Sequence, residues 1–256
     1  MSDGKQQPQF PPLAISDLLV LTLTVSAALA VIAPDIHDFL ALPIEQLRIP
    51  KWRGVVPEIT DYTAIGISLF GLIVLARQRI RGSAFPLAPG HWIFLATGPY
   101  LFLLLVSGAA NQLLMVTWFD LHPGHRSLLS LLFATVLTLS VVFALPGLRA
   151  QEPRWRVCLA LILIWLFIGA AECVQKGPNI RGPLSQHLLA GGATVYLVGF
   201  GSACAAVAID VLRGKRRDWL HYFAVVMLAL YAVSNVLHYG PLLTQWWSDL
   251  FFRLLP

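Results

Sequence analysis

The chain has 256 residues, of which 57% are hydrophobic and only 12% charged, and its mean hydropathy is +0.71. Soluble domains carry about 25% charged residues, so an ordinary globular fold has no place for this much apolar surface. The formal charge of +5 comes largely from short basic clusters between apolar segments, a pattern typical of membrane proteins and not of a nucleic-acid-binding face.

Seven apolar segments have about the 20 residues that a helix needs to cross a bilayer core, and they predict seven transmembrane helices. In chain order they are 13–33, 59–76, 91–111, 126–147, 155–175, 186–210 and 219–240. The polar–apolar alternation of a membrane β-barrel is absent, so the expected fold class is all-α, a polytopic seven-helix bundle. The chain then divides into a polar N-terminus (1–12), a transmembrane domain (13–243) and a C-terminal tail (244–256).

The first apolar segment has an alternative interpretation. Its end, SAALAVIA at 26–33, also resembles the small-residue cleavage site of a signal peptide. The segment is longer than a usual signal-peptide core, and the region before it carries one lysine, which favours a membrane span. Cleavage would leave six spans in the same orientation.

The positive-inside rule orients the predicted bundle. Eleven of the 18 Lys and Arg residues fall on one side, mostly in tight connections. They are Lys5, Arg77, Arg79, Arg81, Arg149, Arg154, Arg156, Arg213, Lys215, Arg216 and Arg217. This side is therefore predicted to be cytoplasmic, with the N-terminus inside and the C-terminus outside.

Two segments are expected to lie at the outer membrane surface. The loop 34–58 contains LPIEQLRIP, a short amphipathic piece with a proline at each end. The tail places its apolar side chains along one helical stripe, as amphipathic interfacial helices do. This stripe consists of Trp246, Trp247, Leu250, Phe251 and Leu254.

Polar residues gather at the predicted outer ends of the spans. Glu172 lies about 25 Å along its helix from Trp155, close to the edge of a core about 30 Å thick. A carboxylate at that depth is unfavourable against lipid and is expected to face the bundle or find a partner. Lys176, one turn further on, offers a simpler explanation as an ion pair at the helix end.

The last span closes with Asn235 and His238, which share one helical face. We expect both to share a polar, ligand-binding pocket with Glu172 and with Asn111 or His187, because mutual hydrogen bonding satisfies polar groups in apolar surroundings. The alternatives are that Asn235 only joins helices and that His238 only anchors its span at the interface.

The outer histidines are also weak candidates for a metal site. His122, His125, His187 and His238 lie on the same predicted side. Three imidazoles with a carboxylate suit zinc, and histidines on facing helices suit haem. On the opposite side, Asp210 and Arg213 are interpreted as a solvated pair at a helix end.

Shared span number alone identifies no family. Microbial rhodopsins also have seven spans, but the segment 219–240 lacks the lysine that binds retinal. Adiponectin/progestin-type receptors and alkaline ceramidases carry a closely spaced histidine pair in the last span, whereas His221 and His238 stand at its opposite ends.

The leading hypothesis is a membrane protein that binds a small molecule or a protein partner in an outward-facing polar cavity, as a sensor, transporter component or complex subunit. One alternative is a membrane-embedded hydrolase or redox protein that uses the outer histidines with a metal or haem. Another is a purely structural subunit. The bilayer is the one partner that composition implies, and nucleic acid is not expected.

Overall fold

The computed structural model describes residues 13–41, 49–82, 88–114, 123–176, 183–215 and 217–254. Every regular element in these ranges is an α-helix. The helices are α1 (Ile15–Leu40), α2 (Ile49–Ile80), α3 (Pro89–Leu114), α4 (Pro123–Ala150), α5 (Pro153–Lys176), α6 (Pro183–Leu212) and α7 (Trp219–Leu254). Within the described residues, all seven are long and apolar enough to cross a membrane, which confirms the predicted all-α, seven-helix class.

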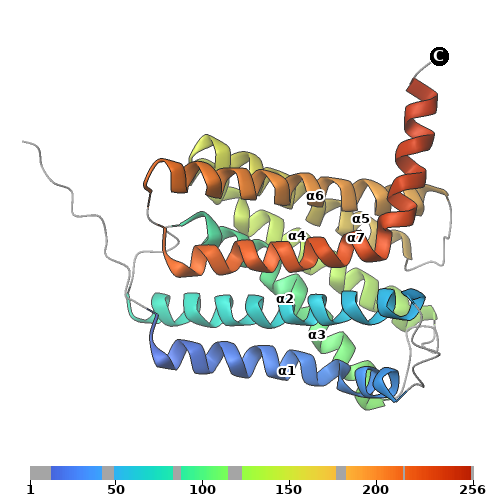
Figure 1. Cartoon of the computed structure of the whole chain (residues 1–256), viewed down its shortest axis with the longest axis horizontal. Coiled ribbons are helices and arrows are strands. Elements are labelled where there is room, and N and C mark those ends of the chain that lie inside the picture. Colours follow the sequence, from blue (N-terminus) through green and yellow to red (C-terminus); the bar gives the residue numbers. More distant parts are fainter. Residues whose placement is uncertain are drawn as a thin grey trace, which may run out of the picture.

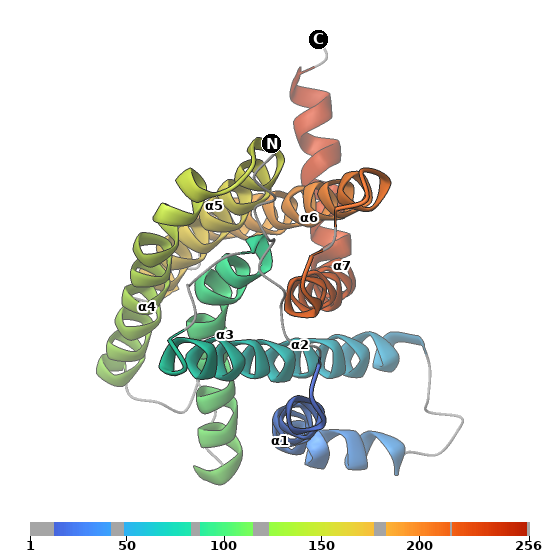
Figure 2. The same cartoon turned by 90° about the vertical axis from the view of Figure 1, so that its left-hand side faces the viewer.

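The helices form one bundle around α3. Helices α1, α2, α7 and α6 pack side by side in that order, and their axes run roughly along the long axis of the molecule (Figure 1). Helix α3 lies in the middle, against α1, α2, α4, α5 and α7, and the pair α4–α5 closes one side (Figure 2). Each connection is short, so consecutive helices alternate in direction.

Large apolar side chains occur both inside the bundle and on its surface. Phe70, Phe94 and Tyr196 are almost fully buried in the core. In contrast, Phe143 is 71% exposed and Phe167 is 62% exposed. A soluble protein rarely leaves such residues on many faces, whereas lipid tails are as apolar as the residues themselves.

The predicted surface loop 34–58 is mostly helical, which corrects that expectation. Helix α1 continues through Pro34 to Leu40, and its last turns leave the axis of the preceding part (Figure 2). Helix α2 begins at Ile49 and includes Pro57. A proline removes one helical hydrogen bond and bends a helix without necessarily ending it. Residues 42–48, which include part of LPIEQLRIP, lie outside the described residues.

The tail continues α7 instead of forming a separate element. Pro241 lies inside this helix, and beyond it the helix turns away from the bundle at a steep angle (Figure 1). The first turns of the tail pack on the beginning of α6, where Leu243 contacts Ala190 and Ala193. Trp247 and Phe251 are exposed further along.

Two helix starts approach each other closely at Gly90. A Cβ atom added to Gly90 of α3 would lie only 2.5 Å from the His221 Cα atom of α7. The Gly90 N–H donates a hydrogen bond of 3.0 Å to His221 Nδ1. Because the first N–H groups of a helix have no partner in their own helix, His221 satisfies one that α3 cannot satisfy itself.

We predict that Gly90→Ala destabilises the protein by about 1–3 kcal/mol, because the methyl group forces the backbones of α3 and α7 apart. Thermal unfolding of the detergent-solubilised protein, followed by tryptophan fluorescence, measures the effect. Gly191→Ala is the matched control, since a Cβ at this α6 position meets nothing within 4 Å. Equal unfolding temperatures for both variants would show that the close approach is unimportant.

Candidate functional site

A small cavity of about 80 Å³ lies between α3, α4, α5, α6 and α7. Its polar lining comes from Glu172, Asn235 and three tyrosines, Tyr100, Tyr231 and Tyr239. The remaining lining is apolar or aromatic and consists of Leu137, Trp165, Leu166, Ile168, Gly169, Leu188, Leu189, Gly192 and Ala193. Polar groups that converge among apolar and aromatic side chains are characteristic of small-molecule sites.

Two helices position the charged and amide groups of this cavity. Glu172 is half-buried near the end of α5, and Asn235 on α7 is buried with 6% of its surface exposed. The Asn235 Nδ2 group donates a 2.8 Å hydrogen bond to the Tyr231 carbonyl of its own helix. This bond orients the amide and satisfies one of its donors within α7, so it does not join α7 to a neighbouring helix.

The two histidines of the predicted pocket are not among the residues that line this cavity. His238 is exposed, and its Nδ1 atom lies 3.4 Å from Ser234 Oγ on the same helix. His187 is exposed on α6 and accepts a 3.1 Å hydrogen bond from Trp246 Nε1. The side chain of Asn111 lies outside the described residues. The structure therefore brings Glu172 and Asn235 together, and the larger five-residue site stays a prediction.

The metal candidates gain no support from the described residues. His122 and the side chain of His125 lie outside them. Among the residues that are described, no three His, Cys, Asp or Glu side chains are grouped closely enough to hold a metal ion.

Aromatic rings form much of the cavity wall. Trp165 contacts Tyr100 with ring centroids 6.0 Å apart and Tyr231 with centroids 5.4 Å apart, at interplanar angles of 84° and 64°. Tyr196 packs behind this pair, with its centroid 4.7 Å from that of Trp165. The Tyr196 hydroxyl donates a 2.8 Å hydrogen bond to the Leu228 carbonyl, which fixes its ring.

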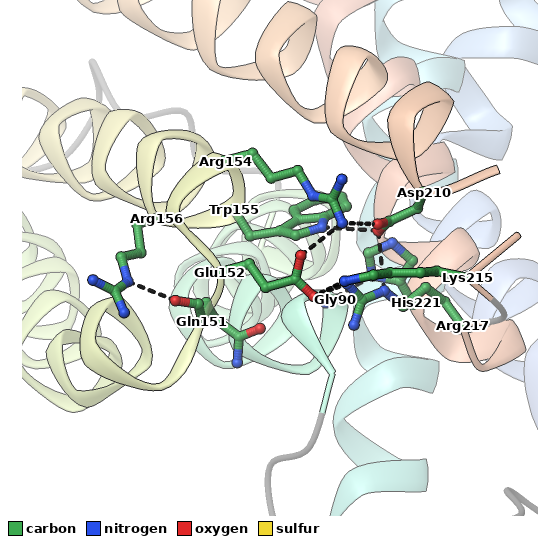
Figure 3. Close-up of polar contacts among 10 residues, drawn as sticks. All are labelled: Gly90, Gln151, Glu152, Arg154, Trp155, Arg156, Asp210, Lys215, Arg217 and His221. Carbon is green, nitrogen blue, oxygen red and sulfur yellow. Dashed lines mark hydrogen bonds and ion pairs between the residues drawn. The ribbon is translucent and has the colours of Figure 1, made fainter. Parts of the chain in front are cut away.

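A second polar cluster lies at the other end of the bundle, where α2, α4 and α6 end and α3, α5 and α7 begin; we call this the Arg-rich end. Its centre is Asp210 on α6, which is 1% exposed. Asp210 accepts hydrogen bonds from Arg154, from Trp155 Nε1 at 3.0 Å and from Arg217 Nε at 3.0 Å (Figure 3).

Glu152 extends this network toward solvent. Its carboxylate accepts hydrogen bonds from Lys215 Nζ at 2.7 Å, Arg217 Nη2 at 3.0 Å and Arg154 Nη2 at 2.6 Å. The hydrogen bond from Lys215, supported by Arg217, holds the pKa of Glu152 below its usual range. The α4–α5 and α6–α7 connections are thus joined by alternating charges.

A histidine–aspartate pair continues the cluster to α3. The Asp218 Oδ1 atom accepts a 2.7 Å hydrogen bond from the His221 N–H, the arrangement of a helix N-cap. Its Oδ2 atom lies 2.9 Å from His91 Nε2 on α3. Burial alone raises the pKa of Asp218, but the contacts with His91 and His221 together outweigh burial and leave that pKa below its usual value.

The caps of α3 and α7 are therefore reciprocal. Asp218 at the start of α7 contacts α3 through His91, while His221 of α7 receives the Gly90 N–H of α3. The His221 ring also contacts the Trp155 ring, with centroids 4.6 Å apart, and so links this pair to the Asp210 network.

The interpretation of Asp210 as a solvated partner of Arg213 was wrong. Asp210 is buried, and its partners come from the start of α5 and from the connection before α7, beyond Arg213. A signal was present, because QEPRWR (151–156) and DVLRGKRRD (210–218) both place carboxylates inside Arg-rich connections. Such opposite charges pair across neighbouring connections, but the sequence does not say which connections are neighbours.

No family model, curated protein or solved structure matches this chain. The site is therefore interpreted from its own geometry.

We predict that Asp210→Asn lowers the free energy of unfolding by about 3–5 kcal/mol, because it leaves two largely buried guanidinium groups without their shared carboxylate. Glu152→Gln is the control, since Glu152 is 36% exposed and exposed ion pairs contribute only about 0–1 kcal/mol. Denaturant unfolding in detergent measures both. Equal, small losses would show that Asp210 is not the centre of the network.

Proposed function

We propose that this chain is a multi-pass membrane protein that binds a small polar ligand in the cavity lined by Glu172 and Asn235. The observation that supports this most directly is the convergence of a carboxylate, an amide and three tyrosines on one cavity between five helices. Binding of this kind suits a sensor, a transporter component or a subunit of a complex. No observation on the described residues favours the alternative with a metal or haem.

We further propose that the Arg-rich end is cytoplasmic and that the cavity belongs to the outer half of the bundle. Support comes from the concentration of Arg and Lys in the short connections of that end. The ion pairs of Arg154 and Arg217 do not weaken this argument, because acidic residues contribute little to the positive-inside rule. Glu172 and Asn235 lie away from the Arg-rich end, which holds the starts of their helices α5 and α7.

The tail is proposed to lie along the outer membrane surface. It turns away from the bundle beyond Pro241, which is the direction that a helix in the membrane plane would take (Figure 1). Trp247 and Phe251 leave apolar surface exposed one helical turn apart. Aromatic and apolar side chains of amphipathic helices insert at the headgroup boundary, so this surface suits lipid as its partner.

Orientation is tested with a reporter that is active only in the cytoplasm. Fusions after Arg81, Arg154 or Lys215 are expected to be active, whereas fusions after Lys176 or Pro256 are expected to be inactive, because the connections of the Arg-rich end stay on the cytoplasmic side. The inverse pattern would place the cavity in the cytoplasmic half and refute the proposed orientation.

Ligand binding is tested with four small probes: methylammonium, acetate, acetamide and glycerol. At least one is expected to raise the unfolding temperature of the purified protein in a saturable manner, because a ligand that binds only the folded state stabilises it. Asn235→Leu is expected to abolish this shift, since leucine removes the amide from the cavity wall.

Val236→Leu is the matched control for this experiment, because Val236 is 49% exposed and lies beside Asn235 on the outer face of α7. It is expected to respond to the probes like the unmodified protein. If no probe binds, or if both variants respond equally, the polar groups only join helices and the purely structural alternative is the better one.

A further inference from the structure

We propose that the end of α4 and the start of α5 form a binding site for the headgroup of an anionic phospholipid, with Arg149 and Arg156 as its charged contacts. The site lies apart from the cavity and goes beyond the proposed function, because it concerns how the bundle meets the bilayer. Four observations support it: the charge balance of the Arg-rich end, the fixed position of the Arg156 guanidinium, the depth of both arginines and the apolar surface beside them.

The charge balance leaves these two arginines without a counter-charge among the described residues. The carboxylates of the polar network are already engaged: Glu152 and Asp210 pair with other basic residues, and Asp218 pairs with a histidine of α3. Arg149 and Arg156 are exposed, and neither forms an ion pair with a described carboxylate. An anionic ligand would supply the negative charge that this corner of the bundle lacks.

Backbone carbonyl groups hold the Arg156 guanidinium beside the end of α4. Its Nε group donates a 2.5 Å hydrogen bond to the Gln151 carbonyl, and its Nη2 group donates a 3.4 Å hydrogen bond to the Arg149 carbonyl. Figure 3 shows Arg156 contacting Gln151 on the side away from Asp210. Because a guanidinium has five N–H donors, these two bonds leave others for the paired contact that phosphate oxygens favour.

Both arginines lie at the depth of a lipid headgroup. The apolar part of α4 ends at Ala150, directly after Arg149, and that of α5 begins at Pro153, three residues before Arg156. Basic side chains between helices at such a boundary are typical contacts of anionic headgroups. This placement does not depend on which side of the membrane the Arg-rich end faces.

Exposed apolar side chains continue from both arginines along their helices. Leu145 lies one turn before Arg149 and is 47% exposed, and Ile164 lies about two turns after Arg156 and is 48% exposed. In a bilayer such side chains face acyl chains. A molecule that joins an anionic head to hydrocarbon chains therefore fits this surface better than a free inorganic anion, so a phospholipid is the occupant that we infer.

The test compares two lipids with identical acyl chains: phosphatidylglycerol, which is anionic, and phosphatidylcholine, which is zwitterionic. Native mass spectrometry of the full-length protein in a nonionic detergent measures the lipid bound over a titration. Phosphatidylglycerol is expected to bind at least about tenfold more tightly. Arg149→Gln is expected to weaken its binding about fivefold, and Arg149→Gln combined with Arg156→Gln is expected to remove the preference, because each arginine adds a similar attraction.

Arg156→Lys separates recognition of the headgroup from general attraction by charge. Lysine keeps the positive charge but cannot form the paired contact, so binding of phosphatidylglycerol is expected to fall by about threefold or more. Arg81→Gln is the matched control, because Arg81 is an exposed arginine that follows α2 at the same end of the bundle. This control is expected to keep the full preference.

The side chain of Arg149 forms no hydrogen bond to another described residue, so Arg149→Gln tests the charge without removing the contacts that Arg156 makes to α4. Its unfolding temperature is expected to equal that of the unmodified protein. A lower unfolding temperature together with unchanged lipid binding would show that Arg149 is structural and would refute its role in the site.

The remaining outcomes are equally decisive. Equal affinity for the two lipids refutes the site. A preference that survives the double replacement also refutes it, because the anionic lipid then binds elsewhere and Arg156 only caps α4. Full competition by inorganic phosphate at the concentration of the lipid would make a free anion the occupant and refute the phospholipid. None of these results bears on the cavity, so this inference and the proposed function fail independently.

Discussion

The burial of one carboxylate at the Arg-rich end constrains how the helices of this protein meet. Asp210 is 1% exposed near the end of α6, so its charge has to be balanced by groups from elsewhere in the chain. Arg154 and Trp155 come from the start of α5, and Arg217 comes from the connection before α7. The Asp210 carboxylate thus joins α6 to the start of α5 and to the segment before α7.

Apolar packing alone would allow α5, α6 and α7 to slide or rotate against one another, because lipid tails and leucine side chains are equally apolar. Directional hydrogen bonds to a single carboxylate prevent this movement.

The two ends of the bundle consequently differ in character. At the Arg-rich end, opposite charges pair with one another and the starts of α3 and α7 cap each other. The two helices approach so closely at Gly90 that a larger residue would not fit there. Toward the other end, the helices leave a small cavity whose lining includes the Glu172 carboxylate and the Asn235 amide. A bundle end that is held by polar contacts, next to a region that contains a cavity, is a common arrangement in proteins. A binding site needs both a fixed frame and some unfilled space.

The sequence predicted the coarse fold well and the polar contacts only in part. Apolar length and short connections were sufficient for seven helices, because the bilayer imposes both on any helical protein that spans it. Depth along a helix singled out Glu172 and Asn235, which both line the cavity, but their role as a binding site stays a prediction. The sequence could not show the direction in which a side chain points around its helix, so His238 was grouped with Asn235 although its ring is exposed.

The predicted pair of Asp210 and Arg213 was wrong for a related reason. Arg213 is near Asp210 in the sequence, whereas the actual partners of Asp210 depend on which segments lie next to each other in space. The prediction of a surface loop at 34–58 was wrong because both Pro34 and Pro57 are accommodated inside helices.

The reciprocal caps of α3 and α7 have a consequence for biogenesis. Membrane proteins are inserted from the N-terminus onward, so α3 enters the bilayer long before α7 has been synthesised. Until then, the Gly90 N–H and the His91 ring lack the partners that His221 and Asp218 provide in the finished bundle. The growing chain therefore lacks these two contacts throughout the synthesis of α4, α5 and α6. Arrival of the last helix provides both contacts together, so a chain that stops before α7 differs chemically from a complete one at this end of the bundle.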